Sequence, residues 1–477
     1  MFIKEEFNTN LQDFVSWMTD YLENVEKYPV RSQVGYGDIR NCFPSEPPVK
    51  GESIPKIFDD FKSHILPGIT HWQSPKFFAY FPANSSPPSI LAEMLTSTLA
   101  VQGMKWITSP AATELEELIC DWLRQMLGLP TEFSGVIQDT ASVATLCAIL
   151  AAREKVTHFE SNRKGVGTHV LRVYCSSEAH SSIEKAVRIA GLGSENLIKI
   201  PVDSLGRLIP EKLESCIVAD LKKGYKPACL VGALGTTGVC AVDPLDAMGK
   251  IAKKYNIWFH VDAAFAGSAL LLPEFRNSIT GLELADSFVF NPHKWMFTNF
   301  DCSLFYAKDK SHLQETFRLV PGYLQTGNDS EVNDYSNWGI QLGRRFRALK
   351  LWFVIRNYGI EGLRKRIREH IELAKYFEEQ ISKLPYFELA LPRTLALVCF
   401  WLNIEDQYST NEKNRLNSEL LEKINDSGQI YISHTLFREK YTLRFVCAQT
   451  YTQKKHVDEA LEVIYRFADQ IINSLKN

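Results

Sequence analysis

A lysine near the middle of the chain stands where its amine could act as a nucleophile. Lys294 follows the apolar run Ser287–Phe290 and is flanked by His293 and Trp295. Apolar surroundings favour the neutral amine, which is the form that attacks a carbonyl carbon to make a Schiff base. The alternative interpretation is a solvated surface lysine. The residues predicted to lie near Lys294 distinguish a nucleophile from a surface residue.

Two further residues have complementary chemistry. Asp262 follows the apolar run Ile257–Val261 and is followed by the small residues Ala263 and Ala264. A carboxylate there suits a protonated ring nitrogen, and a small side chain lets the ring lie flat; an ordinary helix N-cap is the alternative. His180 has a ring that can stack on an aromatic group or supply a proton, although a structural histidine is equally common.

The segment Thr140-Ala141-Ser142 precedes a helical run that contains Leu146 and Ile149. Hydroxyls and free backbone N–H groups at a helix N-terminus form an anion site that suits a phosphate ester. Simple capping of the helix is the alternative interpretation.

Short apolar runs alternate with helical stretches from about residue 134 onward. The predicted strands are Val170–Tyr174, Ala228–Ala233, Ile257–Val261 and Ser287–Phe290, and predicted helices include Ile183–Ala190 and Leu245–Tyr255. This alternation predicts an α/β fold with a mostly parallel sheet and helices on both faces. Polar residues follow the strands, and such strand ends meet at one edge of a sheet. We therefore expect His180, Thr237, Asp262 and Lys294 to share a cleft.

The two ends of the chain differ from the middle. The first helix, from about Leu11 to Val25, and a Pro-rich connection make a thin arm that cannot bury its own core, so we expect it to pack on a second subunit. The last part alternates helices with strand-like runs. The predicted domains are residues 1–86 (helical arm), 87–351 (large domain) and 352–477 (small α+β domain).

Composition excludes several classes of partner. The 477 residues contain 53 Lys+Arg and 56 Asp+Glu, a net charge of −3, so a cationic surface for nucleic acid or an anionic membrane is not expected. The N-terminus lacks an apolar signal segment, and no apolar run approaches the roughly 20 residues of a membrane span. The ten cysteines are not spaced along the sequence as in a metal-binding motif. We predict a cytoplasmic protein without a metal that acts on a small molecule.

Longer motifs resemble one family. They include His71–Pro75, Phe77–Pro82, Ser109–Glu116, His260–Gly267, Asn291–Trp295 and Leu342–Arg347, in this order along nearly the whole chain. Together they resemble the pyridoxal-phosphate-dependent group II amino acid decarboxylases of the aromatic L-amino acid decarboxylase type. The resemblance implies pyridoxal 5'-phosphate as cofactor, the aminotransferase-like fold type I, and a homodimer with its sites at the subunit interface.

The resemblance also implies roles for individual residues. Lys294 matches the Schiff-base lysine, Asp262 the partner of the pyridine nitrogen, and His180 the histidine stacked on the ring. The residues that match the phosphate and ring surroundings are Thr140, Ala141, Ser142, Asn291, His293, Thr237 and Ala264. Those that match the substrate pocket are Trp72, Tyr80, Phe81, Pro82, Met104 and Gly343. Tyr323 matches a mobile-loop tyrosine that returns a proton to the α-carbon.

These matches predict the reaction, and they leave alternatives. Related aldehyde synthases replace this tyrosine or the stacked histidine, so the presence of Tyr323 and His180 favours simple amine production from tyrosine, DOPA, tryptophan or 5-hydroxytryptophan. Relatives that accept histidine or prefer phenols often have serine at the position of Gly343. The alternatives are an aldehyde synthase, a decarboxylase of another acid such as histidine, and a cofactor-binding protein without catalysis. The last is suggested by Asp139, which replaces the family's usual glycine next to the phosphate turn and would repel a phosphate unless it is paired.

Overall fold

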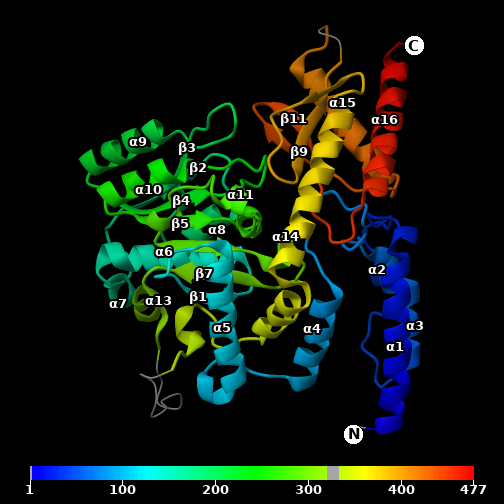
Figure 1. Cartoon of the computed structure of the whole chain (residues 1–477), viewed down its shortest axis with the longest axis horizontal. Coiled ribbons are helices and arrows are strands. Elements are labelled where there is room, and N and C mark those ends of the chain that lie inside the picture. Colours follow the sequence, from blue (N-terminus) through cyan, green and yellow to red (C-terminus); the bar gives the residue numbers. More distant parts are fainter. Residues whose placement is uncertain (1–2, 320–331, 405–406, 477) are drawn as a thin grey trace. The chain divides into compact units, whose positions relative to one another are not determined.

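The computed structural model describes residues 3–319, 332–404 and 407–476 (Figure 1). The chain divides into two compact units, one of residues 83–371 and the other of residues 1–82 with 372–477. We describe each unit by itself, and the three predicted domain ranges stay a prediction.

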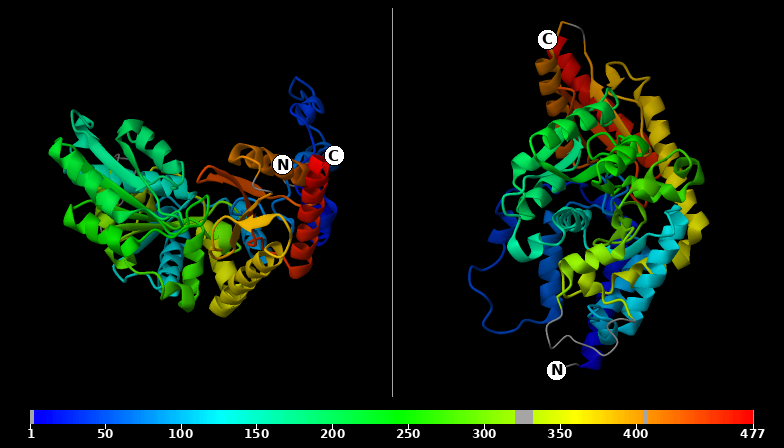
Figure 2. Two further views of the ribbon diagram at one scale, coloured as in Figure 1. Left: turned by 90° about the horizontal axis from the view of Figure 1, so that it is seen from above. Right: turned by 90° about the vertical axis from the view of Figure 1, so that its left-hand side faces the viewer.

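The larger unit is built around a seven-stranded sheet with the order β1-β7-β6-β5-β4-β2-β3. Helices cover both faces of this sheet (Figure 2). The strands are β1 (Ser134–Gln138), β2 (Leu171–Ser176), β3 (Leu197–Ile200), β4 (Lys226–Ala233), β5 (Trp258–Asp262), β6 (Ser287–Phe290) and β7 (Ser303–Ala307). The helices are α4 (Pro87–Leu99), α5 (Pro110–Leu127), α6 (Ala141–Thr157), α7 (Ser161–Lys164), α8 (Ser182–Ile189), α9 (Pro210–Lys222), α10 (Leu245–Lys254), α11 (Pro273–Arg276), α12 (Pro292–Trp295), α13 (Lys310–Phe317) and the first part of α14 (Arg347–Ile381).

The predicted fold class is confirmed. Strands β2 to β6 pair in parallel, and β6 is buried along its whole length. Strands buried on both faces appear in a sequence as continuous apolar runs, and this is why four of them were predicted within two residues of their observed ends. Helix α6 packs against the same core, in which Val173, Val231 and Val289 are fully or almost fully buried.

The sequence prediction missed β1, β3 and β7. Strand β7 lies between β1 and β6 and is antiparallel to both, with Phe305 opposite Val136 on one side and Val289 on the other. Strands β1 and β3 are short, and β1 begins Ser134-Gly135, a pair with low strand propensity. Their positions depend on pairing with distant segments, which local periodicity does not encode.

The smaller unit contains an antiparallel four-stranded sheet with the order β10-β11-β9-β8. Its elements are α1 (Lys4–Asn24), α2 (Asp38–Asn41), α3 (Ile54–Asp60), the end of α14, β8 (Phe387–Leu389), β9 (Leu397–Leu402), α15 (Thr410–Asp426), β10 (Ser433–Phe437), β11 (Lys440–Val446) and α16 (Lys454–Lys476). Among the described residues, no helix combines the length and the apolar character needed to cross a bilayer.

Candidate active site

The polar residues predicted to share a cleft all follow neighbouring strands of the large sheet. His180 comes after β2, Thr237 after β4, Asp262 ends β5 and Lys294 comes after β6. These four strands are adjacent and parallel, so the residues lie at the same edge. The charges of Asp262 and Lys294 both act on the pKa of His180, in opposite directions. The structure therefore brings together the three residues with complementary chemistry.

Lys294 lies on the single-turn helix α12, whose backbone is held by hydrogen bonds from Asn84. The Asn84 backbone N–H donates to the His293 carbonyl oxygen at 2.9 Å, and the Asn84 amide donates to the Lys294 carbonyl oxygen. The next residue, Trp295, is fully buried and stacks on Phe265 with a centroid distance of 4.5 Å. The Lys294 side chain is half-buried, so a rigid turn presents an amine at the edge of the sheet.

Asp262 is held by the turn that follows β5. Its Oδ1 accepts the Ala264 backbone N–H at 3.0 Å, and the Ala264 carbonyl oxygen accepts the Asn291 N–H at 3.0 Å. The second bond ties the turn after β5 to the segment that carries Lys294. These two hydrogen bonds connect the Asp262 carboxylate, through Ala264, to the segment that carries Lys294.

The protonation state of His180 follows from its hydrogen bonds. The Ser182 backbone N–H donates to His180 Nδ1 at 3.1 Å, and the Ser182 hydroxyl lies 2.7 Å from the same atom. A backbone N–H can only donate, so Nδ1 is an acceptor and the proton of the neutral ring is on Nε2. The His180 side chain is exposed on the single chain, but partial desolvation of its ring by neighbouring residues lowers the pKa of His180, which favours this neutral ring at neutral pH.

The N-terminus of α6 has the properties of an anion site. Thr140 is the N-cap, and its hydroxyl accepts the Val143 N–H at 3.4 Å. The N–H groups of Ala141 and Ser142 lie in the first turn, where helix geometry provides no acceptor. Asn291 and His293 come from the neighbouring segment, and both are buried. Burial, followed by the nearby charge of Lys294, lowers the pKa of His293 to about 3.

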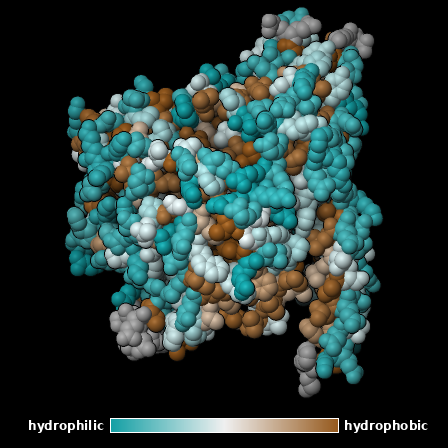
Figure 3. All heavy atoms as spheres, in the orientation of Figure 1, coloured by the Kyte–Doolittle hydropathy of each residue, from teal (hydrophilic) through white to brown (hydrophobic). Residues whose placement is uncertain are grey.

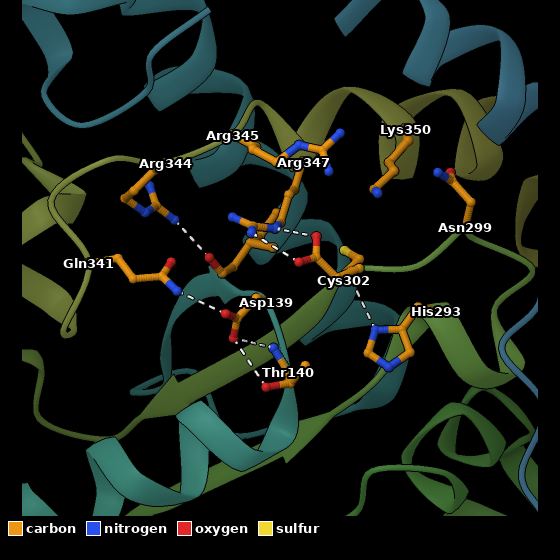
Figure 4. Close-up of polar contacts among 12 residues, drawn as sticks. Asp139, Thr140, His293, Asn299, Cys302, Gln341, Arg344, Arg345, Arg347 and Lys350 are labelled. Atoms are coloured by element: carbon orange, nitrogen blue, oxygen red, sulfur yellow. Dashed lines mark hydrogen bonds and ion pairs between the residues drawn. The ribbon is translucent and has the colours of Figure 1, made fainter. Parts of the chain in front are cut away.

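Asp139 is paired, as a carboxylate beside an anion site requires. It accepts the Thr140 N–H at 2.6 Å, the Thr140 hydroxyl at 3.1 Å and the Gln341 amide at 2.8 Å. Figure 4 shows these bonds, together with the bond from the Cys302 N–H to His293 at 2.9 Å. The hydrogen bonds satisfy the Asp139 carboxylate within the protein.

Sequence reasoning missed Asn84 and Gln341. Asn84 is almost fully buried and holds the backbone of the lysine turn, and Gln341 holds Asp139 across 202 residues of sequence. A signal for Asn84 exists in the polar stretch Asn84-Ser85-Ser86 just before the helix that starts with Pro87-Pro88. Nothing local marks Gln341.

The predicted substrate residues fall in both units. Trp72, Tyr80, Phe81 and Pro82 belong to the smaller unit, where Trp72 stacks on Tyr80 with a centroid distance of 5.9 Å. Tyr80 has a left-handed backbone with φ of 53°, a strained conformation for a side chain of this size. Met104 and Gly343 belong to the larger unit. Tyr323 lies outside the described residues.

Comparison with known proteins identifies the family. The pyridoxal-dependent decarboxylase conserved domain matches residues 37–403. The chain belongs to this family. It is 44% identical to tyrosine decarboxylase 3 of Petroselinum crispum over 98% of this chain and 93% of the relative. It is also 44% identical to phenylacetaldehyde synthase of Arabidopsis thaliana over 96% of this chain and 95% of the relative. The solved structure of Oryza sativa TDC with PLP and tryptamine is 35% identical, with a TM-score of 0.95, and covers 98% of this chain and 99% of that chain.

The residues of this pyridoxal-dependent decarboxylase fit its cofactor. A phosphate ester needs free N–H donors, which the first turn of α6 offers. An aldehyde needs an amine, and a ring nitrogen that must stay protonated needs a carboxylate. Lys294 and Asp262 supply these groups at the same edge of the sheet.

A buried histidine behind the site makes stability depend on pH. His260, in the middle of β5, lies 2.9 Å from the Ser287 hydroxyl and is completely buried, which lowers its pKa to about 4 from 6.5. Between these two pKa values the unfolded chain binds a proton that the folded chain does not, so stability falls as the pH falls. From about pH 7 to about pH 5 we expect wild type to lose about 2 kcal/mol more stability than His260→Gln, which does not titrate. Urea unfolding at both pH values measures this, and equal losses would contradict a neutral His260.

Proposed function

We propose that this enzyme decarboxylates an aromatic L-amino acid, namely tyrosine, DOPA, tryptophan or 5-hydroxytryptophan, to the corresponding amine and CO2. The observation that carries the proposal is the grouping of Lys294, Asp262 and His180 at one edge of the sheet in a pyridoxal-dependent decarboxylase. Relatives named tyrosine decarboxylase and tryptophan decarboxylase support the aromatic side chain of the substrate.

The proposed cofactor-binding roles follow from the donor and acceptor groups. Thr140 and the N–H groups of Ala141 and Ser142 bind the phosphate, and Lys294 Nζ binds the aldehyde carbon. The Asp262 carboxylate holds a proton on the ring nitrogen. When bound, the cofactor supplies an electron-poor ring that accepts the electron pair left by the departing CO2. Asn291 and His293 complete the surroundings of the phosphate, and Thr237 and Ala264 line the ring.

His180 and Tyr323 are the residues proposed to act nearest to the bond that breaks. The neutral His180 ring stacks over the cofactor, and its Nδ1 is engaged by Ser182, which fixes the orientation of the ring. The protein orients the bond between the α-carbon and the carboxylate, which breaks in the reaction. The Tyr323 hydroxyl then returns a proton to the α-carbon. The walls of the substrate pocket are Trp72, Tyr80, Phe81, Pro82, Met104 and Gly343.

The test is a substrate panel with the purified protein and added pyridoxal phosphate. Tyrosine, DOPA, tryptophan, 5-hydroxytryptophan and histidine are supplied separately, and CO2, amine, aldehyde and peroxide are measured. We expect CO2 and amine in equal amounts from at least one of the aromatic acids. If none of the four aromatic acids releases CO2, the proposal is wrong. Release of CO2 from histidine then favours a histidine decarboxylase, and no CO2 from any acid favours a cofactor-binding protein without catalysis.

A second candidate function is that of an aldehyde synthase, in which decarboxylation is followed by oxidative deamination that consumes molecular oxygen. The similarity to phenylacetaldehyde synthase favours it, whereas the presence of both Tyr323 and His180 favours the amine. The panel separates the two functions, because a synthase releases ammonia and hydrogen peroxide in amounts that match the CO2.

Replacing Tyr323 with phenylalanine removes the proposed proton donor. We expect amine formation to fall about a hundredfold, the typical contribution of one positioned general acid, with aldehyde and peroxide rising as a share of product. Product analysis by chromatography with a peroxide assay measures both. An unchanged amine rate in this variant would remove Tyr323 from the mechanism.

We further propose that the protein is a cytoplasmic homodimer. Each chain consists of a helical arm (residues 1–86), a large domain (87–351) and a small domain (352–477), and the arm packs on the second subunit. Large apolar side chains are exposed on the single chain, including Leu91, Leu95 and Leu99 on α4 and Phe7 and Leu11 on α1. Figure 3 shows apolar side chains gathering over α4. Such exposed apolar groups on a single chain are typical of a contact surface, and light scattering tests the proposed dimer mass.

A further inference from the structure

A buried histidine of the larger unit has no part in the proposed mechanism. His370 lies on α14, and its Nδ1 accepts the indole N–H of Trp295 at 3.0 Å. Both side chains are buried, and their ring planes are only 4° apart. An indole N–H can only donate, so Nδ1 is an acceptor and the proton of the neutral His370 ring is on Nε2. The bond joins α14 to the residue that follows Lys294 in the sequence.

The Trp295 indole also contacts the turn that follows β5. It stacks on Phe265, with a centroid distance of 4.5 Å and ring planes 9° apart. Phe265 comes directly after Ala264, which hydrogen-bonds to Asp262 and to the segment that carries Lys294. One buried side chain thus connects the lysine turn to α14 and to the turn that holds the carboxylate.

The lysine turn is too short to hold its own position. It is a helix of four residues, Pro292–Trp295, and a single turn closes few backbone hydrogen bonds. Asn84 holds its backbone, and His370 holds it through the Trp295 side chain. Successive side chains on a helical turn point about 100° apart. The anchored indole therefore sets the direction in which the neighbouring Lys294 side chain leaves the turn.

We propose that His370 is a positioning residue for Lys294: by accepting the Trp295 indole N–H, it holds the lysine turn so that the amine meets the aldehyde of pyridoxal phosphate in the correct alignment. This inference rests on the proposed function, which makes Lys294 the residue that binds the cofactor. In that step the neutral amine forms a C=N bond to the aldehyde carbon, and the aldehyde oxygen leaves as water with two protons of the amine. Displacement of a reacting group by about 1 Å lowers such a rate up to about a hundredfold.

The test measures two rates in the full-length protein. The first is the rate at which visible absorbance appears when pyridoxal phosphate is added to protein freed of cofactor, with borohydride reduction and peptide mass analysis to confirm attachment at Lys294. The second is kcat for the aromatic acid that is turned over best. In His370→Phe, which keeps a ring but has no acceptor for the indole N–H, we expect both rates to fall about tenfold. In His370→Asn, whose side-chain oxygen takes the place of Nδ1, both should stay within about threefold of wild type.

Trp295→Phe removes the other partner of the same bond and keeps a ring on Phe265. It should lower the attachment rate as His370→Phe does, and it provides the test if His370→Phe does not fold. Because both substitutions break one bond, the double variant should be no slower than either single variant. Losses that multiply in the double variant would overturn the proposal.

A destabilised protein that keeps the bond is the structural control. Ile367 is fully buried on α14, one turn before His370, and Ile367→Ala lowers stability without removing either partner of the bond. We expect it to attach the cofactor at the wild-type rate under conditions in which urea unfolding shows every variant to be folded. An equal loss in Ile367→Ala, or a wild-type rate in His370→Phe, would overturn the proposal. If wild type attaches the cofactor at Lys294 but releases no CO2 from any acid, the proposed function has failed, and the attachment rates still decide the role of His370.

Discussion

Replacing Lys294 with alanine is expected to abolish CO2 release from every aromatic acid, with a loss of at least about a thousandfold. The proposed nucleophile is the Lys294 amine, which follows the end of β6 on a turn whose backbone is fixed by Asn84. On the proposed assignment, the variant without this amine has no covalent connection to the cofactor. The visible absorbance that appears when pyridoxal phosphate is added should be lost or shifted in this variant.

Two further variants show whether the loss is specific. Lys294→Arg keeps the positive charge but not the nucleophile, and we expect it to be as inactive as Lys294→Ala. Lys250→Ala removes an exposed lysine that pairs with Asp246 at 2.7 Å on the surface of α10, and it should behave as wild type. Borohydride reduction followed by peptide mass analysis locates the covalent bond. A reducible bond that survives in Lys294→Ala would contradict the assignment.

The parts of the site that could be predicted from the sequence are those that local patterns encode. The strands that end near Asp262 and Lys294 are buried, so they appear in the sequence as apolar runs. The polar residue that follows each run can therefore be identified from the sequence. The orientation of those residues toward one edge then follows from the parallel pairing rule. The helix beginning at Ala141 is similarly marked by its N-cap, Thr140.

The parts that could not be predicted depend on contacts between distant segments. The sequence predicts that Asp139 repels a phosphate unless it is paired, but it does not reveal the pairing, because the amide that pairs with Asp139 is 202 residues away. Asn84 supports the lysine turn from 210 residues away. Strand β7 lies between β1 and β6 and is antiparallel to both, within a sheet that is otherwise parallel. Periodicity within a window carries no information about such pairings.

A second large loss of activity is expected when Asp262 is replaced. The variant has to remove the negative charge without removing the hydrogen bond that Asp262 accepts. Asp262→Asn removes the charge but keeps an oxygen that can accept the Ala264 N–H, the bond that Asp262 makes at 3.0 Å. We expect kcat to fall about a hundredfold, or about 3 kcal/mol of transition-state stabilisation, because a neutral amide does not hold a proton on the ring nitrogen. The free energy of unfolding, measured with urea, should change by less than about 0.5 kcal/mol.

The electronic role of Asp262 can be separated from a role in binding. An N-methylated pyridoxal phosphate has a fixed positive charge on the ring nitrogen and needs no carboxylate to keep it. We expect this analogue to restore a large part of the activity of Asp262→Asn and to bring little benefit to wild type, since the charge is then supplied by the cofactor. A variant that is equally slow with both cofactors, or that has lost its affinity for pyridoxal phosphate while keeping kcat, would show that the carboxylate at the end of β5 acts by holding the ring in place.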